Sequence, residues 1–134
     1  KDKNVEVIAF KNDHGDFENS FGFLFITKDK RILFSGDTGV SDNLMNYGEN
    51  LDILVHEVYS SETFKNKTDD WQIYHNAHHT SSIDLGIIAN KLKPKKLVLS
   101  HILFWGATEE SLLDDVKSNF NGNAIIAKDL MVIR

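Results

Sequence analysis

The sequence predicts an α/β (α+β) fold, in which a mixed β-sheet carries helices packed on one face. Two observations predict this class. The first part of the chain contains short apolar segments typical of strands, and the later part alternates strand-like and helix-like segments. Alternation of that kind favours a sheet with helices against it. The 134 residues contain no internal repeat and no Gly/Ser-rich linker, so we expect one compact unit.

Four strands are expected in the first half of the chain. They are VEVIAF (5–10), FGFLFIT (21–27), RILFSG (31–36) and LDILVHE (51–57). The KDK triplet at 28–30 is expected to form a turn, which makes the second and third strands a hairpin. The stretch from Ser60 to His79 is polar and aromatic without a clear period, and no element is assigned to it.

The second half of the chain carries two predicted helices. Ser81 and Asp84 have capping-box spacing, apolar residues then share one face, and Pro94 ends this first helix. A strand, KKLVLSH (95–101), follows it. Thr108 precedes two glutamates and an apolar stripe, which predicts the second helix. Two short strands, NAIIAK (123–128) and LMVIR (130–134), are expected at the end.

Composition narrows the chemistry that the chain can perform. It has no cysteine, which excludes disulfides and thiolate ligands and leaves imidazole, carboxylate and water for any metal ion. The formal net charge of -5 argues against binding nucleic acid by bulk electrostatics. No apolar run approaches the roughly 18 residues of a membrane span, so no membrane partner is expected.

Ionisable side chains lie at the ends of several of the predicted strands or directly after them. They are Asp37, His56, Glu57 and His101; two more histidines, His14 and His79, lie in loops, the latter before a helix. Loops beyond strand ends form the ligand crevice in layered α/β folds. A cluster of imidazoles and carboxylates there predicts a metal site, although each residue alone is also a common turn or core residue.

Several motifs resemble one family of enzymes. They are LFSGDTG, LDILVHEVYSS, HHTSSIDLGIIANKLKPKKLVLSHI and LFWGATEE with AKDLMVI, which together span most of the chain. This ordered set is similar to the C-terminal half of the metallo-β-lactamase-fold hydrolases, in particular the ribonuclease Z-like and arylsulfatase-like branch. The resemblance implies half of an αββα sandwich, with a mixed sheet and helices on one face.

The resemblance also implies roles for the residues at the strand ends. It implies that His14, Asp37 and His101 are metal ligands, and that His56, Glu57 and His79 act in proton transfer and substrate contact. The family site holds two metal ions, usually zinc; iron and manganese are the alternatives. His79 rather than its neighbour His78 matches the family motif, and His75 is expected in a surface or loop position.

One part of the family pattern is absent from this chain. The principal metal-binding motif of the N-terminal half, HxHxDH, occurs nowhere in residues 1–134. We therefore expect residues 1–134 to be the C-terminal half of a longer hydrolase, cut before Lys1, with the missing N-terminal half as its partner. The alternative is a degenerate domain. Either way the chain alone is expected to bind zinc weakly and to be nearly inactive.

The predicted function of the intact parent is hydrolysis of ester-type bonds through a water activated by a binuclear metal site. The expected substrate is a small ester, sulfate ester, phosphodiester or lactone. Ribonuclease Z-like tRNA 3′ processing is an alternative, but the 22 residues between His14 and Asp37 leave no room for a tRNA-binding arm. Another alternative is a non-catalytic binding domain of the same fold. The sequence does not distinguish a cytoplasmic from a periplasmic location.

Two further expectations concern apolar surface. Phe104 and Trp105 follow a predicted metal ligand and are assigned to the core or an interface, with a pocket wall as the alternative. An isolated half-domain also exposes the apolar face that its other half covers, so we expect self-association into oligomers or aggregates.

Overall fold

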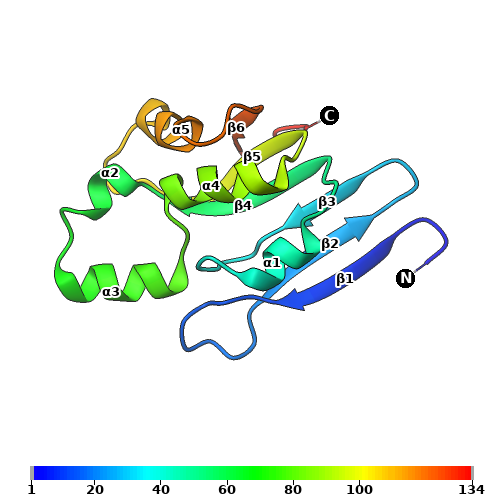
Figure 1. Ribbon diagram of the computed structural model, residues 1–134, viewed down its shortest axis with the longest axis horizontal. Coiled ribbons are helices and arrows are strands. Elements are labelled where there is room, and N and C mark those ends of the chain that lie inside the picture. Colours follow the sequence, from blue (N-terminus) through cyan, green and yellow to red (C-terminus); the bar gives the residue numbers. More distant parts are fainter. Residues whose placement is uncertain (1, 134) are drawn as a thin grey trace.

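Six strands form one mixed sheet in the computed structural model, which describes residues 2–133 (Figure 1). The strands pair in chain order, from β1 at one edge to β6 at the other. The elements, in chain order, are β1 (Glu6–Lys11), β2 (Phe21–Ile26), β3 (Arg31–Phe34), α1 (Asp42–Tyr47), β4 (Ile53–Tyr59), α2 (Ser61–Phe64), α3 (Asp69–His78), α4 (Ser82–Leu92), β5 (Lys96–Leu103), α5 (Glu109–Lys117) and β6 (Ala124–Ile126).

The first three strands are antiparallel and form a meander. Leu24 of β2 lies opposite Leu33 of β3, and both are buried. The turn between these strands forms because the Thr27 hydroxyl accepts hydrogen bonds from the backbone N–H groups of Asp29 and Lys30, at 3.3 and 3.0 Å. The predicted hairpin is therefore confirmed, and it fixes which side chains of β2 and β3 face the helices.

The last four strands are parallel, and helices cross between them. β3 pairs with β4, β4 with β5, and β5 with β6, all in parallel register. Helix α4 begins where predicted, since the Ser81 hydroxyl accepts a hydrogen bond from the Asp84 N–H at 3.0 Å. It ends at Lys93, whose φ of 49° is left-handed, just before Pro94. The Thr108 hydroxyl caps α5 in the same way.

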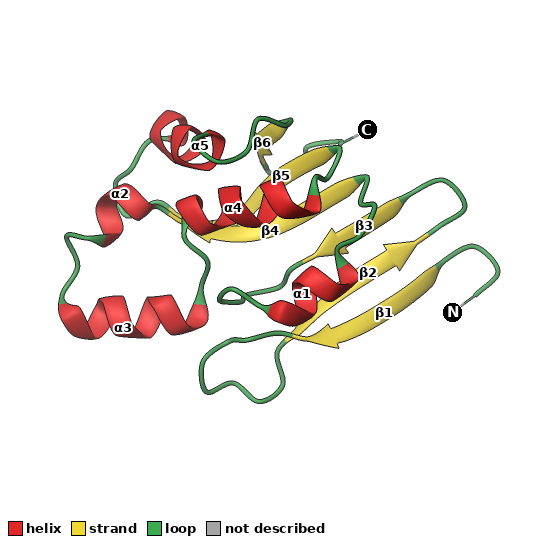
Figure 2. Cartoon of the chain, in the orientation of Figure 1, coloured by secondary structure: helices red, strands yellow, loops and turns green. Residues whose placement is uncertain are grey.

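Helices α1, α4 and α5 lie over one face of the sheet (Figure 2). The core sits between them and that face, with Leu33, Leu54, Leu85, Leu97 and Val116 all fully buried. The opposite face of the sheet carries no helix among the described residues (Figure 2). The predicted mixed sheet with helices on one face is confirmed. No helix within residues 2–133 has the length and apolar character that crossing a membrane requires.

Three sequence predictions need correction or completion. The strand predicted at 130–134 is wrong for the described residues 130–133, which are coil; the Met131 N–H instead closes a turn on the Lys128 carbonyl at 3.0 Å. Residues 60–79, left unassigned, hold helices α2 and α3. The short helix α1 was not predicted. Trp71 and Ile73 of α3 are exposed, so α3 lacks the apolar stripe that marks a helix in sequence.

Candidate metal-binding site

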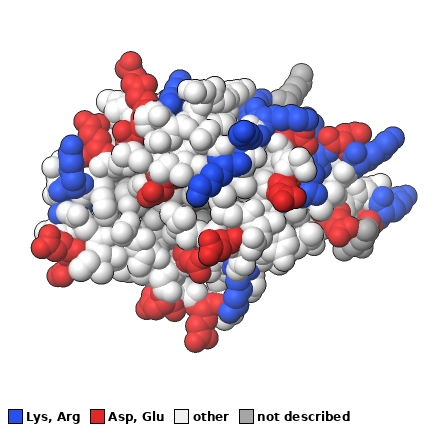
Figure 3. Space-filling view, in the orientation of Figure 1, with Lys and Arg blue, Asp and Glu red and all other residues white. Residues whose placement is uncertain are grey.

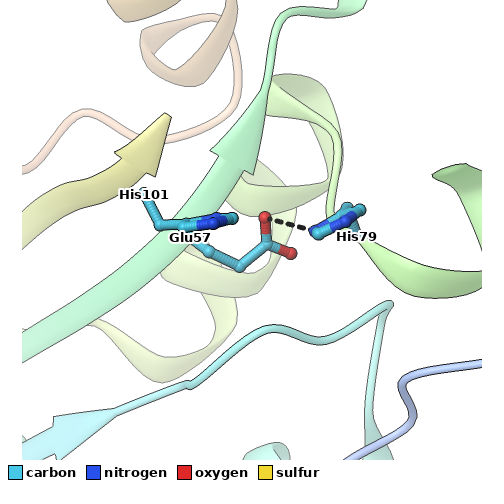
Figure 4. A group of neighbouring side chains, drawn as sticks. All are labelled: Glu57, His79 and His101. Atoms are coloured by element: carbon cyan, nitrogen blue, oxygen red, sulfur yellow. Dashed lines mark hydrogen bonds and ion pairs between the residues drawn. The ribbon is translucent and has the colours of Figure 1, made fainter. Parts of the chain in front are cut away.

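Glu57, His79 and His101 converge at one edge of the sheet. One ligand-type atom from each lies within 4.8 Å of the other two. Glu57 comes from β4, His101 from β5 and His79 from the junction between α3 and α4 (Figure 4). The parallel strands β4 and β5 end at the same edge, so side chains far apart in sequence meet there. This is the edge at which the sequence predicted a metal site.

His101 reaches this edge because β5 bulges. Ser100 pairs with Glu57 and Ile102 pairs with Val58, so His101 is an extra residue in the register. Its φ of 42° is in the left-handed region, which is uncommon for a residue other than glycine. Bulges re-aim a side chain and are frequent beside functional sites. The imidazole is half exposed, and its Nδ1 lies 3.6 Å from an Asp37 carboxylate oxygen.

Asp37 is held in the loop after β3. Gly36 precedes it with a φ of 62°, and a Cβ at Gly36 would lie 2.5 Å from the Phe21 carbonyl oxygen. Only glycine fits both demands, so the chain turns sharply at the end of β3. Ser20 adds a hydrogen bond from its hydroxyl to the Asp37 carbonyl, at 3.1 Å. The Asp37 carboxylate is 42% exposed, which leaves its oxygens open toward the site.

Glu57 and His79 form a buried pair. One Glu57 oxygen lies 3.3 Å from His79 Nδ1, and the other accepts a hydrogen bond from the Thr80 N–H at 2.7 Å. Burial by itself lowers the pKa of His79, but the hydrogen bond and charge of Glu57, with the charge of Asp37, outweigh it and raise the pKa above the usual value for histidine. His79 therefore holds a proton more readily than a free imidazole.

His14 approaches the same group from the loop after β1. Its Nδ1 donates to the His78 carbonyl at 2.7 Å, so in the neutral ring Nε2 keeps its lone pair. Metal-ligating histidines commonly use their second nitrogen in this way. The His14 and His79 ring centroids are 5.3 Å apart. The neighbouring Gly15 leaves room for the His78 ring, since a Cβ there would lie 2.1 Å from that ring.

His56 is not brought to this edge. Its side chain is fully buried and shares the face of Leu54 rather than that of Glu57. Its Nδ1 donates to the Glu57 carbonyl at 2.6 Å, and Nε2 is buried without a partner. Burial lowers the pKa of His56, against the smaller effect of Glu57, so its ring is neutral. The surface or loop position predicted for His75 is wrong, because His75 lies in α3 and is 8% exposed.

Three polar residues that sequence reasoning missed tie the loops of the site together. The buried Thr38 accepts from the Asp13 N–H at 3.3 Å, and its carbonyl accepts from the Thr80 hydroxyl at 2.7 Å. Asn12 donates from its amide to the Ser35 carbonyl. The Ser35 hydroxyl accepts from the Glu57 N–H at 3.1 Å. The GDTG motif was a signal for Thr38, but nothing in the sequence marked Asn12 or Ser35.

The donor set fits a divalent cation. Imidazole nitrogens and carboxylate oxygens without thiolate are ligands that zinc accepts, and iron and manganese accept them too. The open donors are the imidazoles of His14 and His101 and the carboxylate of Asp37. Glu57 differs, because both of its oxygens already accept hydrogen bonds from within the chain. The arrangement is thus a candidate site for a divalent metal, built from side chains on five separate segments.

Comparisons with known proteins concern the fold and the sequence of the chain. No protein-family model matches the chain. In fold, it resembles a metallo-β-lactamase fold protein, YhfI, from Bacillus subtilis, with a TM-score of 0.76 and 21% identity, over 92% of this chain and 47% of the other. It also resembles the short form of human tRNase Z, with a TM-score of 0.68 and 22% identity, over 100% of this chain and 44% of the other.

The fold is therefore the one seen in part of a metallo-β-lactamase-fold protein, and the candidate site lies at one edge of its sheet. In sequence, the chain is 34% identical over 125 residues to ribonuclease Z from Bacillus velezensis, covering 90% of this chain and 38% of that protein. The chain is therefore similar, in sequence and in fold, to a part of the ribonuclease Z proteins. It spans about a third of the length of the curated relatives it matches, from 31% to 38% for the first three.

Proposed function

We propose that the complete protein containing this chain is a metal-dependent phosphodiester hydrolase that acts on RNA. The observation that carries the proposal is the convergence of Asp37 and His101 with the Glu57–His79 pair at the carboxyl ends of the parallel strands. The ribonuclease Z relatives support RNA as the substrate class. This ranks RNA above the small ester-type substrates that were expected from the sequence.

Each side chain has a distinct proposed role. His14, Asp37 and His101 hold divalent metal, with zinc as the first candidate and two ions in the complete site. Metal ions so placed supply a water of lowered pKa and positive charge against the developing oxyanion. Asp37 would be central to holding the metal, because its half-exposed carboxylate lies beside His101.

His79 is proposed to hold and deliver a proton. Burial lowers the pKa of His79, but the hydrogen bond and charge of Glu57 raise it more, so the ring keeps its proton to a higher pH than a free imidazole does. Glu57 fixes the ring through Nδ1, which leaves Nε2 to donate to a substrate oxygen or a leaving group. The Thr80 N–H in turn fixes Glu57. His56 has no proposed contact with substrate, because it is buried on the other face of β4.

A second sheet is proposed to cover the open face of this one. Phe21, Phe23 and Phe34 are each about two-fifths exposed on that face, at 38%, 41% and 42%. A cavity of about 210 Å³ joins these phenylalanines to Asp37 and His101, so whatever covers the face also reaches the site. The chain spans less than half of each of the two solved structures named above. We therefore propose that residues 1–134 form one half of an αββα sandwich.

The charge distribution suggests how RNA is held. On the face seen in Figure 3, most Lys and Arg side chains gather toward the end away from α3, and Asp and Glu side chains lie among them. Such a surface does not provide the continuous basic stripe that binds nucleic acid by charge alone. The proposed RNA contact therefore depends on the site and a few residues near it.

A small phosphodiester is the second candidate substrate. Only 22 residues separate His14 from Asp37, and β2 and β3 occupy much of that segment. The chain thus has no long insertion there that could grip a tRNA. A structural neighbour at 21% identity and a TM-score of 0.61 is a diphosphatase of the PhnP family, which shows the fold alone.

The test is metal content and hydrolysis in the complete protein, purified without chelator. The proposal expects close to two equivalents of zinc, iron or manganese, and cleavage of an RNA oligonucleotide that EDTA stops. Asp37→Asn should lose both metal and cleavage, whereas Asp42→Asn, at an exposed position of α1, should change neither. Full metal content in Asp37→Asn would overturn the ligand assignment. Cleavage of bis(p-nitrophenyl) phosphate without any RNA cleavage would favour the small substrate.

A further inference from the structure

A stripe of side chains along α3 leads from solvent to the candidate site. Lys67, Trp71, His75 and His79 are spaced four residues apart, from just before the helix to its C-terminal cap. Residues at this spacing lie on one face of a helix. The ten residues of α3 extend about 15 Å, so the stripe is long enough to hold part of an extended ligand.

Trp105 packs along this stripe and completes an aromatic surface. Its ring centroid lies 6.4 Å from that of Trp71 and 4.8 Å from that of His75. The next ring contact, from His75 to His79, is 5.5 Å. Beneath Trp105, Tyr59 is buried and contacts it at 5.5 Å. We call the set of Lys67, Trp71, His75 and Trp105 the α3 ledge.

The backbone holds Trp105 in a costly conformation. Its φ is 47° and that of Gly106 is 95°, so two successive residues are left-handed. A left-handed residue other than glycine costs free energy and persists only where its surroundings impose it. Here the Ala107 N–H closes the turn on the Phe104 carbonyl at 2.9 Å, and the Thr63 hydroxyl donates to the same carbonyl at 3.1 Å. The indole is thereby fixed against α3.

The ledge is not simply part of the hydrophobic core. Trp71 is 51% exposed, although it is the largest side chain of the stripe, and Trp105 is only partly buried. Both rings therefore keep apolar surface open to solvent beside the site. Tryptophan faces of this kind stack nucleobases with little regard to sequence.

The ledge also carries a positive charge without a balancing carboxylate. The Lys67 ammonium lies 5.6 Å from the Trp71 ring centroid and 5.0 Å from that of Trp105. No carboxylate of residues 2–133 forms an ion pair with it. Lys67 is a partly buried residue, and its ammonium, close to two indoles, is a suitable partner for a phosphate.

We propose that the α3 ledge binds a nucleobase and its adjoining phosphate, and so presents a single-stranded nucleotide chain to the candidate site. The base stacks on the face of Trp71, to which the Trp105 ring is nearly perpendicular at 78°, and Lys67 contacts the phosphate on the side away from His79. The proposal rests on the proposed function, because it names the part of the substrate that lies beside the bond to be cleaved. Trp71 and Lys67 are binding residues in it and take no part in the chemistry.

The test measures binding rather than cleavage, in the complete protein with EDTA present. The probes are a fluorescent single-stranded RNA oligonucleotide, an abasic oligonucleotide of the same length, and AMP. We expect Trp71→Ala to weaken binding of the RNA about 10-fold or more, and binding of the abasic strand far less. Trp71→Phe should retain most of the affinity, since it keeps a ring. Lys67→Gln should weaken binding of both strands.

Matched controls lie close by. Ile73→Ala removes a side chain that is 72% exposed on another face of α3, and Lys65→Gln removes an exposed charge two residues from Lys67. Neither should change affinity. An equal loss for RNA and abasic strand in Trp71→Ala, or no loss in either, would overturn the proposal. Circular dichroism checks folding; if Trp71→Ala is unfolded, Trp71→Phe and Lys67→Gln decide, and full RNA affinity in Lys67→Gln would count against the ledge.

The measurements with RNA and with AMP show whether the ledge binds an RNA strand or a single nucleotide. A Trp71-dependent affinity for AMP equal to that for the RNA indicates a nucleotide-sized ligand, whereas tighter binding of the oligonucleotide indicates RNA. Binding in EDTA does not require hydrolysis. A protein that binds RNA through Trp71 but cleaves nothing would therefore retain the ledge and refute the proposed function. If the Trp71→Ala protein instead binds and cleaves RNA as well as the unmodified protein, the proposed function is retained and the ledge is refuted.

Discussion

The two faces of the sheet differ sharply although they are built from the same strands. Leu24 and Leu33 are almost completely buried under the helices, whereas their neighbours Phe23 and Phe34 are 41% and 42% exposed on the other face. Strand residues alternate between faces, so each strand supplies apolar side chains to both. A strand that is apolar on both faces is typical of a sheet covered on both sides. The side chains of the covered face are buried within this chain, and the exposed apolar side chains of the open face are typical of an interface.

The largest contrast is expected between Leu33→Ala and Phe34→Ala. In residues 1–134 alone, Leu33→Ala should lower the free energy of unfolding by about 2–5 kcal/mol, because it leaves a cavity in a packed core. Phe34→Ala should cost much less, since the phenylalanine lacks a covering layer. Urea unfolding of both variants measures the difference. Similar losses for the two would mean that the open face is packed as well as the covered one.

The open face should also control association. At micromolar concentration we expect residues 1–134 to self-associate, because exposed apolar patches of this kind mark interfaces. Replacing Phe23 and Phe34 together by lysine should shift the chain toward monomer, as measured by light scattering. A matched pair of exposed replacements in α5, Glu110→Lys and Asp114→Lys, should leave association unchanged. A stable monomer in the unmodified chain would contradict the open-face interpretation.

A smaller effect is expected at the edge where the two faces meet. Burial lowers the pKa of His79 and Glu57 raises it more, so Glu57→Gln should lower the pKa of His79 in metal-free protein. The raised pKa stabilises the folded state below the unfolded value of histidine, and this contribution disappears as pH rises through the folded value. Proton NMR of the His79 ring against pH measures it. An unchanged pKa in Glu57→Gln would remove Glu57 as the cause.

The smallest expected effect is at a helix end on the covered face. Thr108→Ala should cost about 1 kcal/mol, because the hydroxyl that accepts from the Ser111 N–H at 3.1 Å is lost. Thr108→Ser keeps the hydroxyl and should cost a few tenths at most. Thermal unfolding of the two variants distinguishes cap loss from a general effect of substitution at this position. Equal losses in both would assign the role to the threonine methyl group.

Local signals in the sequence were reliable where the chain supplies its own structural cause. The capping residues Ser81 and Thr108 predicted the start of α4 and α5, and both accept the expected backbone hydrogen bonds. Apolar runs predicted β2 and β3 with their correct first residues, and the predicted ends lie one residue beyond β2 and two residues beyond β3. The segment 130–134 misled because it is apolar but finds no strand to pair with.

The sequence predicted which residues form the candidate site better than it predicted how they are arranged. The resemblance to the metallo-β-lactamase-fold hydrolases pointed to His14, Asp37, Glu57, His79 and His101, and the structure brings these five together; their roles remain proposals. His56 was included because it precedes Glu57, and only the pleat of β4 separates the two onto opposite faces. The four-residue spacing from Lys67 to His79 was present in the sequence, but these residues are mostly polar and so did not indicate a helix.

The sequence by itself determined the strands, the two capped helices and the identity of the strand-end imidazoles and carboxylates, because these depend on neighbours a few residues apart. Only the tertiary structure decided that the bulge at His101 turns its ring toward Asp37, that Glu57 is shared between His79 and Thr80, and that Trp105 lies on α3. Those contacts join residues that are more than 20 positions apart in the sequence. Their geometry follows from the packing of the sheet, which no local pattern encodes.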